Sequence, residues 1–478
     1  MVANSTYLPT LATSTAGKRN TSHMNNRTAA SGETHVPLWE SVFAVFGILL
    51  CSRALNNIFS VVPMEGEAIA PGGITAKLVI YLAFYGITAV LLMRDWNAFL
   101  QLVSRQKILV SLLVLALFSP LWSFDPMTSL EKVVGLFGCT SLGLYLYLRF
   151  PALNLLQILA AALAIILMAS FFVALAYPET GLMTGAHEDL WRGVFQHKNR
   201  LGRYSVLAGV VFVTLAIWQP NQRALLIAGC GFALLLVVMS GSKTSLICGL
   251  IVFSCLAFYL FRDGRRGFAV GVTLFALISG ACLVTQTVYK IVPSFLISEP
   301  ANCLQKKLSG SSGACNIIEA ASLRGPQSLK FKTGRGRVEL WGHVLHKVKE
   351  RPLLGYGVGG FWRGNKEPSN YIWEREPWHP THAHNGFVDL AAQLGLIGAV
   401  IFGASVFSPA LFAIRSGLTK GAQMETIVFG AILGSLLLGN LGESFLLKTN
   451  SFTWALMVAT LLTLSSAERT TKRALARE

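Results

Sequence analysis

The sequence has 478 residues, of which 53% are hydrophobic and only 13% charged, and its mean hydropathy is +0.55. A soluble globular domain carries about 25% charged residues, so the composition excludes a string of soluble domains. It also excludes disordered, collagen-like and disulfide-dense chains. A polytopic membrane protein remains, yet its few charges sum to +17.

Twelve apolar stretches follow one another along the chain, each close to the roughly 20 residues that cross a bilayer as a helix. We expect spans over residues 38–60, 74–93, 107–123, 133–149, 153–177, 203–219, 223–241, 244–262, 267–289, 386–413, 425–441 and 451–467. The first stretch is the least apolar, since it holds Glu40 and Arg53. No short apolar segment with a cleavage site precedes it, so we expect no cleaved signal peptide.

The distribution of Lys and Arg between loops predicts the orientation, because cytoplasmic loops are enriched in both. Every second loop is basic and the loops between them are acidic or mixed. Both termini are therefore expected in the cytoplasm. Five segments are expected: a disordered cytoplasmic tail (1–36), nine spans (37–289), an external loop (290–385), three spans (386–467) and a cytoplasmic tail (468–478).

The long external loop is unusually basic, with fourteen Lys or Arg against seven Glu. Loops longer than about 60 residues cross membranes largely regardless of charge, so topology does not explain this excess. An anionic ligand would explain it. The loop also holds Cys303 and Cys315 around a Gly/Ser-rich turn, and an oxidising compartment would permit a disulfide between them. Two free thiols are the alternative.

A histidine cluster ends this loop, with His379, His382 and His384 directly before the apolar span that begins near Phe387. His384 is therefore expected at a helix N-terminus, which favours anions and the neutral imidazole that a general base needs. The alternative is an ordinary polar surface. The cluster could also hold a transition metal, but no supporting Cys or Glu-x-x-His pattern occurs, so no metal is predicted.

An amphipathic helix is expected after Thr333, with apolar residues at helical spacing and an end marked by Pro352. Arg335 and Arg337 lie at its start, where the helix dipole disfavours a cation unless a phosphate is bound. A solvated charge is the alternative. The glycines of segment 355–360 resemble a phosphate loop only loosely, and without the strand–GxxxxGK–helix context they more simply allow a tight fold against the bilayer.

A second basic segment precedes the sixth span. It combines aromatic residues with Arg192, Lys198, Arg200 and Arg203, against the positive-inside trend. A phosphate-bearing lipid headgroup would account for these cations. Glu443, expected outside the membrane between the last two spans, could orient a histidine or bind a sugar hydroxyl, and otherwise is a surface acid.

Four motifs in linked order resemble the O-antigen ligase and polymerase superfamily, closest to its exopolysaccharide-production polymerases. They are Gly193-Val-Phe-Gln-His-Lys-Asn199, Gly334-Arg-Gly-Arg337-Val-Glu-Leu-Trp341, Pro352-Leu-Leu-Gly-Tyr-Gly357, and His384-Asn385 with Gly395. The resemblance covers residues of about 180–450. It implies an all-α polytopic membrane glycosyltransferase of the lipid-dependent (GT-C-like) class, with about twelve transmembrane helices and one long periplasmic loop that carries short amphipathic helices.

The resemblance also implies a reaction and a site. The enzyme would polymerise undecaprenyl-pyrophosphate-linked repeat units at the periplasmic face of a bacterial inner membrane, with inversion and without metal or other cofactor. His384 and Arg337 would be catalytic, with some doubt between Arg337 and Arg335. The expected substrate-binding residues are Arg192, His197, Lys198, Asn199, Arg203, Arg335, Asn385 and Glu443.

Other functions remain open at this stage. The ligase alternative transfers the glycan to lipid A core. A transporter or flippase would fit the span count, but such proteins place charges inside the spans and show internal repeats, and these spans are nearly free of charge. A scaffold in an export complex is a third class. The partners expected are the lipid-linked glycan, membrane lipids, and a chain-length regulator and flippase of the same system, but no nucleic acid.

Overall fold

The structure, a computed structural model, describes residues 36–55, 71–184, 189–291, 335–376, 378–419 and 422–477. Residues Phe43–Glu478 form one compact unit; of the preceding unit, Met1–Val42, only the start of the first helix is described. The described part is helical, and its one isolated β-bridge joins Leu182 to Trp191. The predicted all-α class is therefore confirmed.

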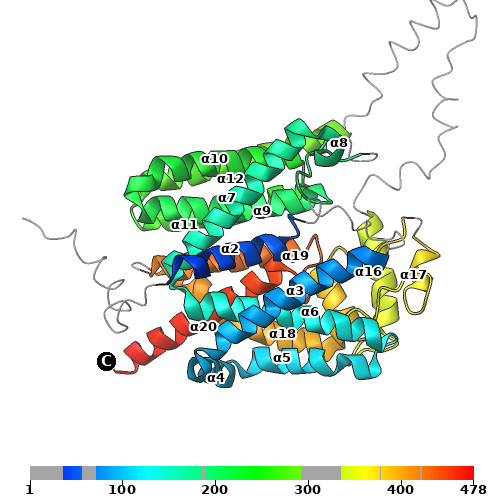
Figure 1. Cartoon of the computed structure of the whole chain (residues 1–478). Coiled ribbons are helices and arrows are strands. Elements are labelled where there is room, and N and C mark those ends of the chain that lie inside the picture. Colours follow the sequence, from blue (N-terminus) through cyan, green and yellow to red (C-terminus); the bar gives the residue numbers. More distant parts are fainter. Residues whose placement is uncertain are drawn as a thin grey trace, which may run out of the picture. The chain divides into compact units, whose positions relative to one another are not determined.

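Each of the twelve apolar stretches contains a helix, although the first stretch extends beyond its helix into residues outside the described part (Figure 1). These helices are α2 (Leu38–Ser52), α3 (Pro71–Met93), α5 (Lys107–Phe118), α6 (Pro126–Arg149), α7 (Ala152–Ala176), α9 (Lys198–Trp218), α10 (Arg223–Ser240), α11 (Lys243–Arg262), α12 (Arg266–Ile291), α18 (Gly386–Leu418), α19 (Met424–Asn440) and α20 (Phe452–Leu475). Shorter helices join them: α4 (Trp96–Arg105), α8 (Pro178–Gly181), α16 (Arg335–Val348), α17 (Asn370–Trp373) and the 3-10 turns η1 (Ser119–Trp122) and η3 (Pro220–Gln222).

Six helical segments of the described residues are long and apolar enough to cross a membrane. They are Ala152–Ala176, Lys198–Trp218, Pro220–Ser240, Lys243–Arg262, Arg266–Thr285 and Gly386–Leu418. A seventh span results if α3 and the unexpected helix α4, bent by 95° from it, count as one. Three apolar helices, α2, α5 with η1, and α19, are shorter. The chain is thus a multi-pass membrane protein with six or seven candidate spans, fewer than the twelve predicted.

The helices of Phe43–Glu478 pack in two groups that meet at α19. Helices α7, α9, α10, α11 and α12 contact one another, and α3, α5, α6, α18 and α20 form the other group. A glycine allows the close approach of α6 to α20, because a Cβ at Gly143 would lie 2.4 Å from the carbonyl oxygen of Ala455. Beside it, the indole of Trp454 donates a buried 2.9 Å hydrogen bond to Thr140 Oγ1.

Helix α18 is broken near its start. Gly395 has φ 63° and ψ −164°, which interrupts the helical ladder. Segment 352–357 fills the break: Tyr356 N donates to Ala392 O (2.9 Å), and Leu396 N donates to Pro352 O (2.8 Å). The glycine motif therefore folds tightly against a broken helix.

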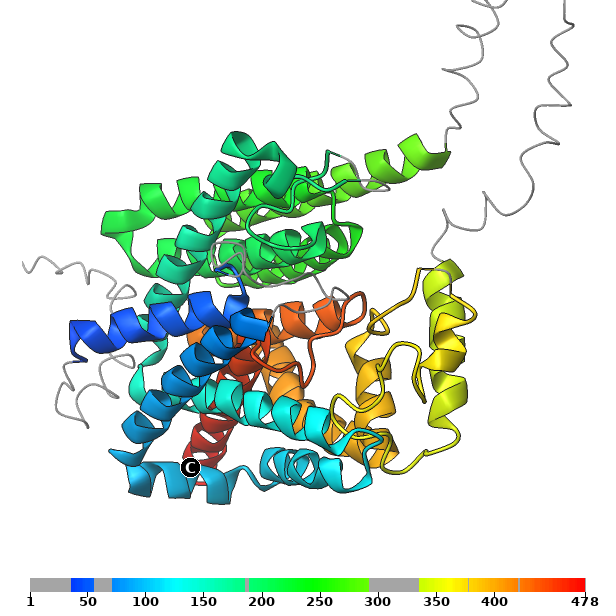
Figure 2. The same ribbon diagram turned by 45° about the vertical axis from the view of Figure 1, so that its right-hand side comes forward.

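Helices α16 and α17 and the loop between them have a small apolar core of their own. Its buried members are Leu340, Val344, Tyr356, Phe361, Ile372, Ala383 and Ala392. Figure 2 shows α16 (yellow-green) and the yellow loop lying together at one end of the orange helix α18. Because this core includes residues before and within α18, α16 is held rigidly against the start of that helix.

Candidate active site

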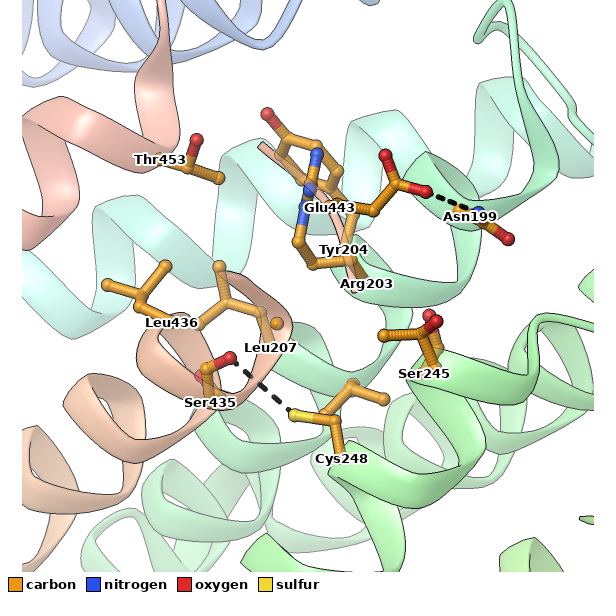
Figure 3. Close-up of a pocket in the computed structure, with 13 residues that line it drawn as sticks. Asn199, Arg203, Tyr204, Leu207, Ser245, Cys248, Ser435, Leu436, Glu443 and Thr453 are labelled. Carbon is orange, nitrogen blue, oxygen red and sulfur yellow. Dashed lines mark hydrogen bonds between the residues drawn. The ribbon is translucent and has the colours of Figure 1, made fainter. Parts of the chain in front are cut away.

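A cavity of about 190 Å³ lies where four segments meet: the end of α2, the start of α9, the histidine loop before α18, and loop 441–451 before α20. Five residues expected at the site line it: His197, Asn199, Arg203, His384 and Glu443. A smaller and mostly apolar pocket adjoins it and shares Asn199, Arg203 and Glu443 (Figure 3). Residues far apart in the sequence are thus brought to one place.

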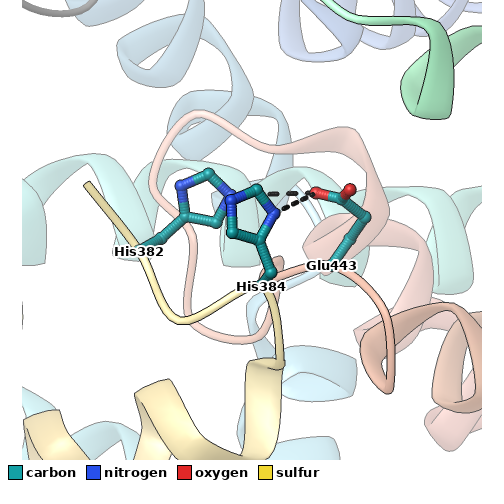
Figure 4. A group of neighbouring side chains, drawn as sticks. All are labelled: His382, His384 and Glu443. Atoms are coloured by element: carbon teal, nitrogen blue, oxygen red, sulfur yellow. Dashed lines mark ion pairs between the residues drawn. The ribbon is translucent and has the colours of Figure 1, made fainter. Parts of the chain in front are cut away.

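Glu443 connects the predicted site residues to one another. Its Oε1 accepts a hydrogen bond from Asn199 Nδ2 and lies 3.9 Å from the guanidinium of Arg337. Its Oε2 lies 3.8 Å from His382 Nε2 and 3.7 Å from His384 Nδ1 (Figure 4). One carboxylate therefore joins the start of α9, helix α16 and the histidine loop.

Both backbone polar groups of Ala383, the residue before His384, are held by hydrogen bonds. Ala383 N donates to both carboxylate oxygens of Asp389 (3.1 and 3.2 Å), and its carbonyl accepts 2.8 Å from the indole of Trp341. Trp362 donates a 2.7 Å hydrogen bond to the same Asp389. These bonds stabilise the left-handed backbone of His384, whose φ is 50°, a conformation that costs a non-glycine residue free energy.

Helix α16 contacts both the loop that carries His384 and the loop that carries Glu443. Arg337 and Trp341 are four residues apart and so share one helix face. Trp341 holds the loop that carries His384, while Arg337 NH1 donates 2.9 Å to the carbonyl of Gly442, the residue before Glu443. Because of the four-residue spacing of the Arg-x-x-x-Trp motif, one face of the helix contacts both loops.

Asn385 has a positioning role in the structure. Its side chain caps α18 by accepting from the backbone N–H groups of Phe387 and Val388 (3.0 and 3.3 Å). Its own backbone N–H donates 3.0 Å to Ser444 Oγ. The cap thus fixes the histidine loop to the loop that carries Glu443.

The charge states of His384 and Glu443 follow from their surroundings. Burial lowers the pKa of His384 below its ordinary value; the Glu443 carboxylate opposes this, and the positive charges of His382 and Arg337 add to it. Burial alone would raise the pKa of Glu443, but His382 and His384 outweigh burial and hold that pKa well below its usual range. Near neutral pH a neutral imidazole therefore faces an ionised carboxylate, as in a general base and its orienting acid.

His382, His384 and Glu443 are also arranged so that they could hold a metal ion, since their ligand atoms lie within 4.8 Å of one another. Two imidazoles and a carboxylate suit a transition metal. However, Arg337 lies 3.9 Å from the same carboxylate, and a nearby cation repels a divalent ion. The same histidine and glutamate side chains can act as an acid–base pair without a metal.

The remaining expected residues lie elsewhere or outside the description. Lys198 Nζ donates 2.9 Å to the carbonyl of Gly241, so it ties α9 to the end of α10. Arg192 binds the carbonyls of Thr180 and Glu179 through its guanidinium, and neither Lys198 nor Arg192 lines the cavity. His197 caps α9 by accepting from Asn199 N. The side chain of Arg335 and both Cys303 and Cys315 lie outside the described residues.

Three cations that line the cavity were not assigned to the site from the sequence: Arg53, Arg200 and Lys448. Arg53 had already marked the first apolar stretch as unusual, and Arg200 belonged to the basic segment before α9. Lys448 stood out in no pattern, because the loop before α20 has no motif of its own.

The fold and the site together define a multi-pass membrane protein with a histidine–carboxylate pair and adjacent arginines. Residues 228–403, which include Arg337 and His384, match the family described as O-antigen ligase. The predicted resemblance to this enzyme family is confirmed over these residues.

Distant relatives agree with this assignment. The chain is 22% identical over 362 residues to the "Exopolysaccharide production protein ExoQ" of Rhizobium meliloti, a match that covers 74% of this chain and 76% of the relative. It is 22% identical over 366 residues to a "Putative polysaccharide ligase" of Rickettsia felis, over 72% of this chain and 78% of the relative. The names of these two relatives refer to exopolysaccharide production and to polysaccharide ligation.

Proposed function

We propose that the protein polymerises undecaprenyl-pyrophosphate-linked oligosaccharide repeat units at the periplasmic face of a bacterial inner membrane. The observation that carries this proposal is the pair formed by His384 and Glu443 in a cavity with several cations. A general base is needed for the acceptor hydroxyl, and positive charge for the departing pyrophosphate. The exopolysaccharide relative supports a polymer as the product.

The reaction is an inverting displacement at the anomeric carbon of the donor sugar. Glu443 Oε2 lies 3.7 Å from Nδ1 of His384, which makes no hydrogen bond to the described residues. The negative charge of Glu443 favours a proton on Nδ1, so that Nε2 carries the lone pair. Nε2 takes the proton of the acceptor hydroxyl as its oxygen attacks. The new C–O bond forms while the bond to the pyrophosphate breaks, and its electron pair leaves with the pyrophosphate. Glu443 stabilises the imidazolium that results.

Arginine charge replaces a metal in this mechanism. Arg203 lines the cavity, and its guanidinium lies 4.4 Å from the ring centroid of Phe445 while its Nε makes no hydrogen bond to the described residues. Arg337 stands beside Glu443 at 3.9 Å. Both can neutralise phosphoryl oxygens, for which guanidinium groups are geometrically suited. No nucleotide is consumed, since the donor's own pyrophosphate bond supplies the driving force.

The topology proposed with this function has twelve spans. The shorter helices α2, α5 and α19, together with α3, α6 and α20, would cross with the six longer ones, so that both termini are cytoplasmic and residues 290–385 are periplasmic. The proposed segments are the tails 1–36 and 468–478 and the helices within 37–289 and 386–467. Single cysteines at Lys349 and Lys472 would test this, because an impermeant thiol reagent on intact spheroplasts should label only the former.

A ligase is the second candidate, because relatives named "Putative polysaccharide ligase" match as well. Both reactions use one donor and differ in the acceptor. Purified protein incubated with lipid-linked repeat units alone should yield a ladder of polymer if it is a polymerase. A reaction that begins only when lipid A core is added would overturn the polymerase proposal and support the ligase.

Complementation supplies the test in cells. His384→Ala and Arg337→Ala should express normally in a deletion strain, give no long polymer and accumulate lipid-linked repeat units. Wild-type polymer from the His384 variant would contradict its role as the base. A chain-length regulator and a flippase of the same export system are the partners proposed for the cellular reaction.

A further inference from the structure

A tryptophan beside the proposed base has no part in the proposed chemistry. The ring centroid of Trp378 lies 5.5 Å from that of His384, with an angle of 47° between the two rings. Trp378 is 39% exposed. The other large apolar side chains that are exposed in the described residues 335–386 are aliphatic, namely Val338, Leu345, Leu353 and Leu354. The site therefore has an open aromatic surface directly beside His384.

The indole of Trp378 is held in one orientation. Its Nε1 donates a 2.9 Å hydrogen bond to Oε2 of Glu376, and Oε1 of the same carboxylate lies 3.7 Å from Nε2 of His343 on α16. Glu376 is only 6% exposed, and a buried carboxylate needs such partners because burying an unpaired charge is costly. Since the ring is already fixed, a ligand that binds to it does not have to order a mobile side chain.

The direction of the indole N–H distinguishes Trp378 from a tryptophan that anchors a protein at the membrane surface. Such a tryptophan keeps its ring in the apolar layer and its N–H in the wet headgroup region. The N–H of Trp378 is instead directed at the buried carboxylate of Glu376. The exposed part of its side chain is therefore mainly ring carbon, which suits a ligand with one apolar face.

A sugar ring has such a face together with polar edges. Its C–H groups are attracted to the negatively charged face of an aromatic ring. Its hydroxyls project from the edge, where the imidazoles of His382 and His384, whose ring centroids are 4.0 Å apart, can donate or accept hydrogen bonds. Ligand sites commonly combine aromatic walls with a few polar groups in this way.

We propose that Trp378 is the platform on which the reacting sugar of the acceptor lies, and that Glu376 is the positioning residue that orients it. The acceptor is chosen over the donor because its hydroxyl must reach Nε2 of His384, and a sugar on Trp378 has its hydroxyls beside that imidazole. This inference rests on the proposed function for the identity of the acceptor as a glycan. Sugar binding can nevertheless be measured without glycosyl transfer.

The first test is the dependence of ladder formation on the concentration of lipid-linked repeat units, with the purified full-length protein in detergent. Trp378→Ala should raise KM about tenfold while kcat stays within about threefold of wild type, since the platform binds the sugar but moves no proton. Trp378→Phe keeps an aromatic face, so its KM should stay within about threefold of wild type. Trp96→Ala removes an exposed tryptophan from α4, and this matched control should change neither constant.

The second test is calorimetric titration with a repeat-unit oligosaccharide that mild acid has released from its lipid. Because this oligosaccharide has no pyrophosphate, it cannot act as the donor. Trp378→Ala should bind it about tenfold more weakly than the wild type, and so should Glu376→Ala, since the indole then loses its hydrogen-bond partner. Glu376→Gln keeps an acceptor for the indole N–H and should stay within about threefold of wild type.

A double variant tests whether Glu376 acts through Trp378. Trp378→Ala combined with Glu376→Ala should bind the oligosaccharide no more weakly than Trp378→Ala alone, because the two side chains act as one unit. Losses that add in the double variant would contradict the positioning role of Glu376. Should Glu376→Ala prove unstable in thermal melting, Glu376→Gln and the Trp378 variants decide the question.

Unchanged KM and unchanged oligosaccharide affinity in Trp378→Ala would overturn the proposal and leave Trp378 as an anchor at the membrane surface. A lower kcat with an unchanged KM would also overturn it, since that pattern belongs to a residue that shapes the base. If the wild type binds the oligosaccharide through Trp378 but never forms a ladder, the proposed function fails and the sugar site stands. A wild-type ladder matched by Trp378→Ala in both constants leaves the proposed function standing without this platform.

Discussion

The indole nitrogen of Trp341 donates a 2.8 Å hydrogen bond to the carbonyl of Ala383, the residue directly before His384. Ala383 is fully buried, so no water can replace this donor without rearrangement. The bond makes Trp341 a positioning residue for His384, although 42 residues separate the donor from the acceptor.

Trp341→Phe should therefore lower the turnover number while leaving donor binding intact. Phenylalanine preserves most of the packing but leaves the carbonyl of Ala383 without its donor, at a cost of about 1–3 kcal/mol. We expect kcat to fall about tenfold, with the affinity for inorganic pyrophosphate unchanged. Trp96→Phe, an exposed tryptophan on α4, is the matched control, and an equal loss in both variants would rule out the positioning role.

Glu443→Gln should change both the rate and its pH dependence. The rate should drop about a hundredfold or more because the imidazolium loses its stabilising charge. The negative charge of Glu443 raises the pKa of His384 against the lowering effect of burial, so its removal should lower that pKa further. The base works when neutral, so the acidic limb of the kcat/KM profile should move to lower pH.

The measurement is the pH profile of ladder formation for wild type and variant. In the wild type the acidic limb should already lie below the ordinary histidine value, since the pKa of His384 is lowered overall. A limb that stays in place, or moves to higher pH, in Glu443→Gln would show that the two side chains are not coupled.

Chelation of metals should leave activity unchanged. The proposed leaving-group stabilisation comes from Arg203 and Arg337, so treatment with EDTA followed by desalting should not slow ladder formation. Added Zn²⁺ should inhibit, because His382, His384 and Glu443 could bind it and thereby occupy the base. Loss of activity in EDTA, restored by a divalent ion, would contradict the metal-free mechanism.

Gly395→Ala should destabilise the protein. Gly395 has φ 63° and ψ −164°, and an added Cβ would lie 2.2 Å from the carbonyl oxygen of Leu353. The expected cost is at least about 1–3 kcal/mol from the backbone alone. Gly403→Ala lies in the same helix with open space around its Cβ, and it should raise stability by about 0.5–1 kcal/mol. Thermal melting in detergent compares the two, and equal shifts would contradict the role of the break in α18.

Much of the helical framework could be predicted from hydropathy, because an apolar stretch of sufficient length must form its backbone hydrogen bonds within itself in a membrane. Each of the twelve stretches contains a helix for this reason. The break at Gly395 and the bend between α3 and α4 were not foreseen, since both depend on what packs against them. Six or seven helical segments meet the criteria of length and hydropathy for a span, while α2, α5 with η1, and α19 are shorter.

The excess of Lys and Arg in the sequence indicated the segments that form the site, but not each residue that lies in it. Arg337 and His384 were assigned from motifs and Arg203 from the basic segment before α9, and the structure brings all three near Glu443. Lys198 and Arg192 were also assigned to the site, but their side chains donate hydrogen bonds to backbone carbonyls instead. A local pattern shows that a cation is present at a helix start, but not the direction in which its side chain points.

Composition and hydropathy alone settled that this is a helical membrane protein, and linked motifs indicated its family, because both depend on properties local to the chain. Only the tertiary structure decided that Glu443 is the common partner of Asn199, Arg337 and His384, and that Arg53 and Lys448 line the same cavity as Asn199, His384 and Glu443. Contacts between segments hundreds of residues apart depend on how the helices pack. The hydrophobic periodicity of one segment does not predict where another segment lies.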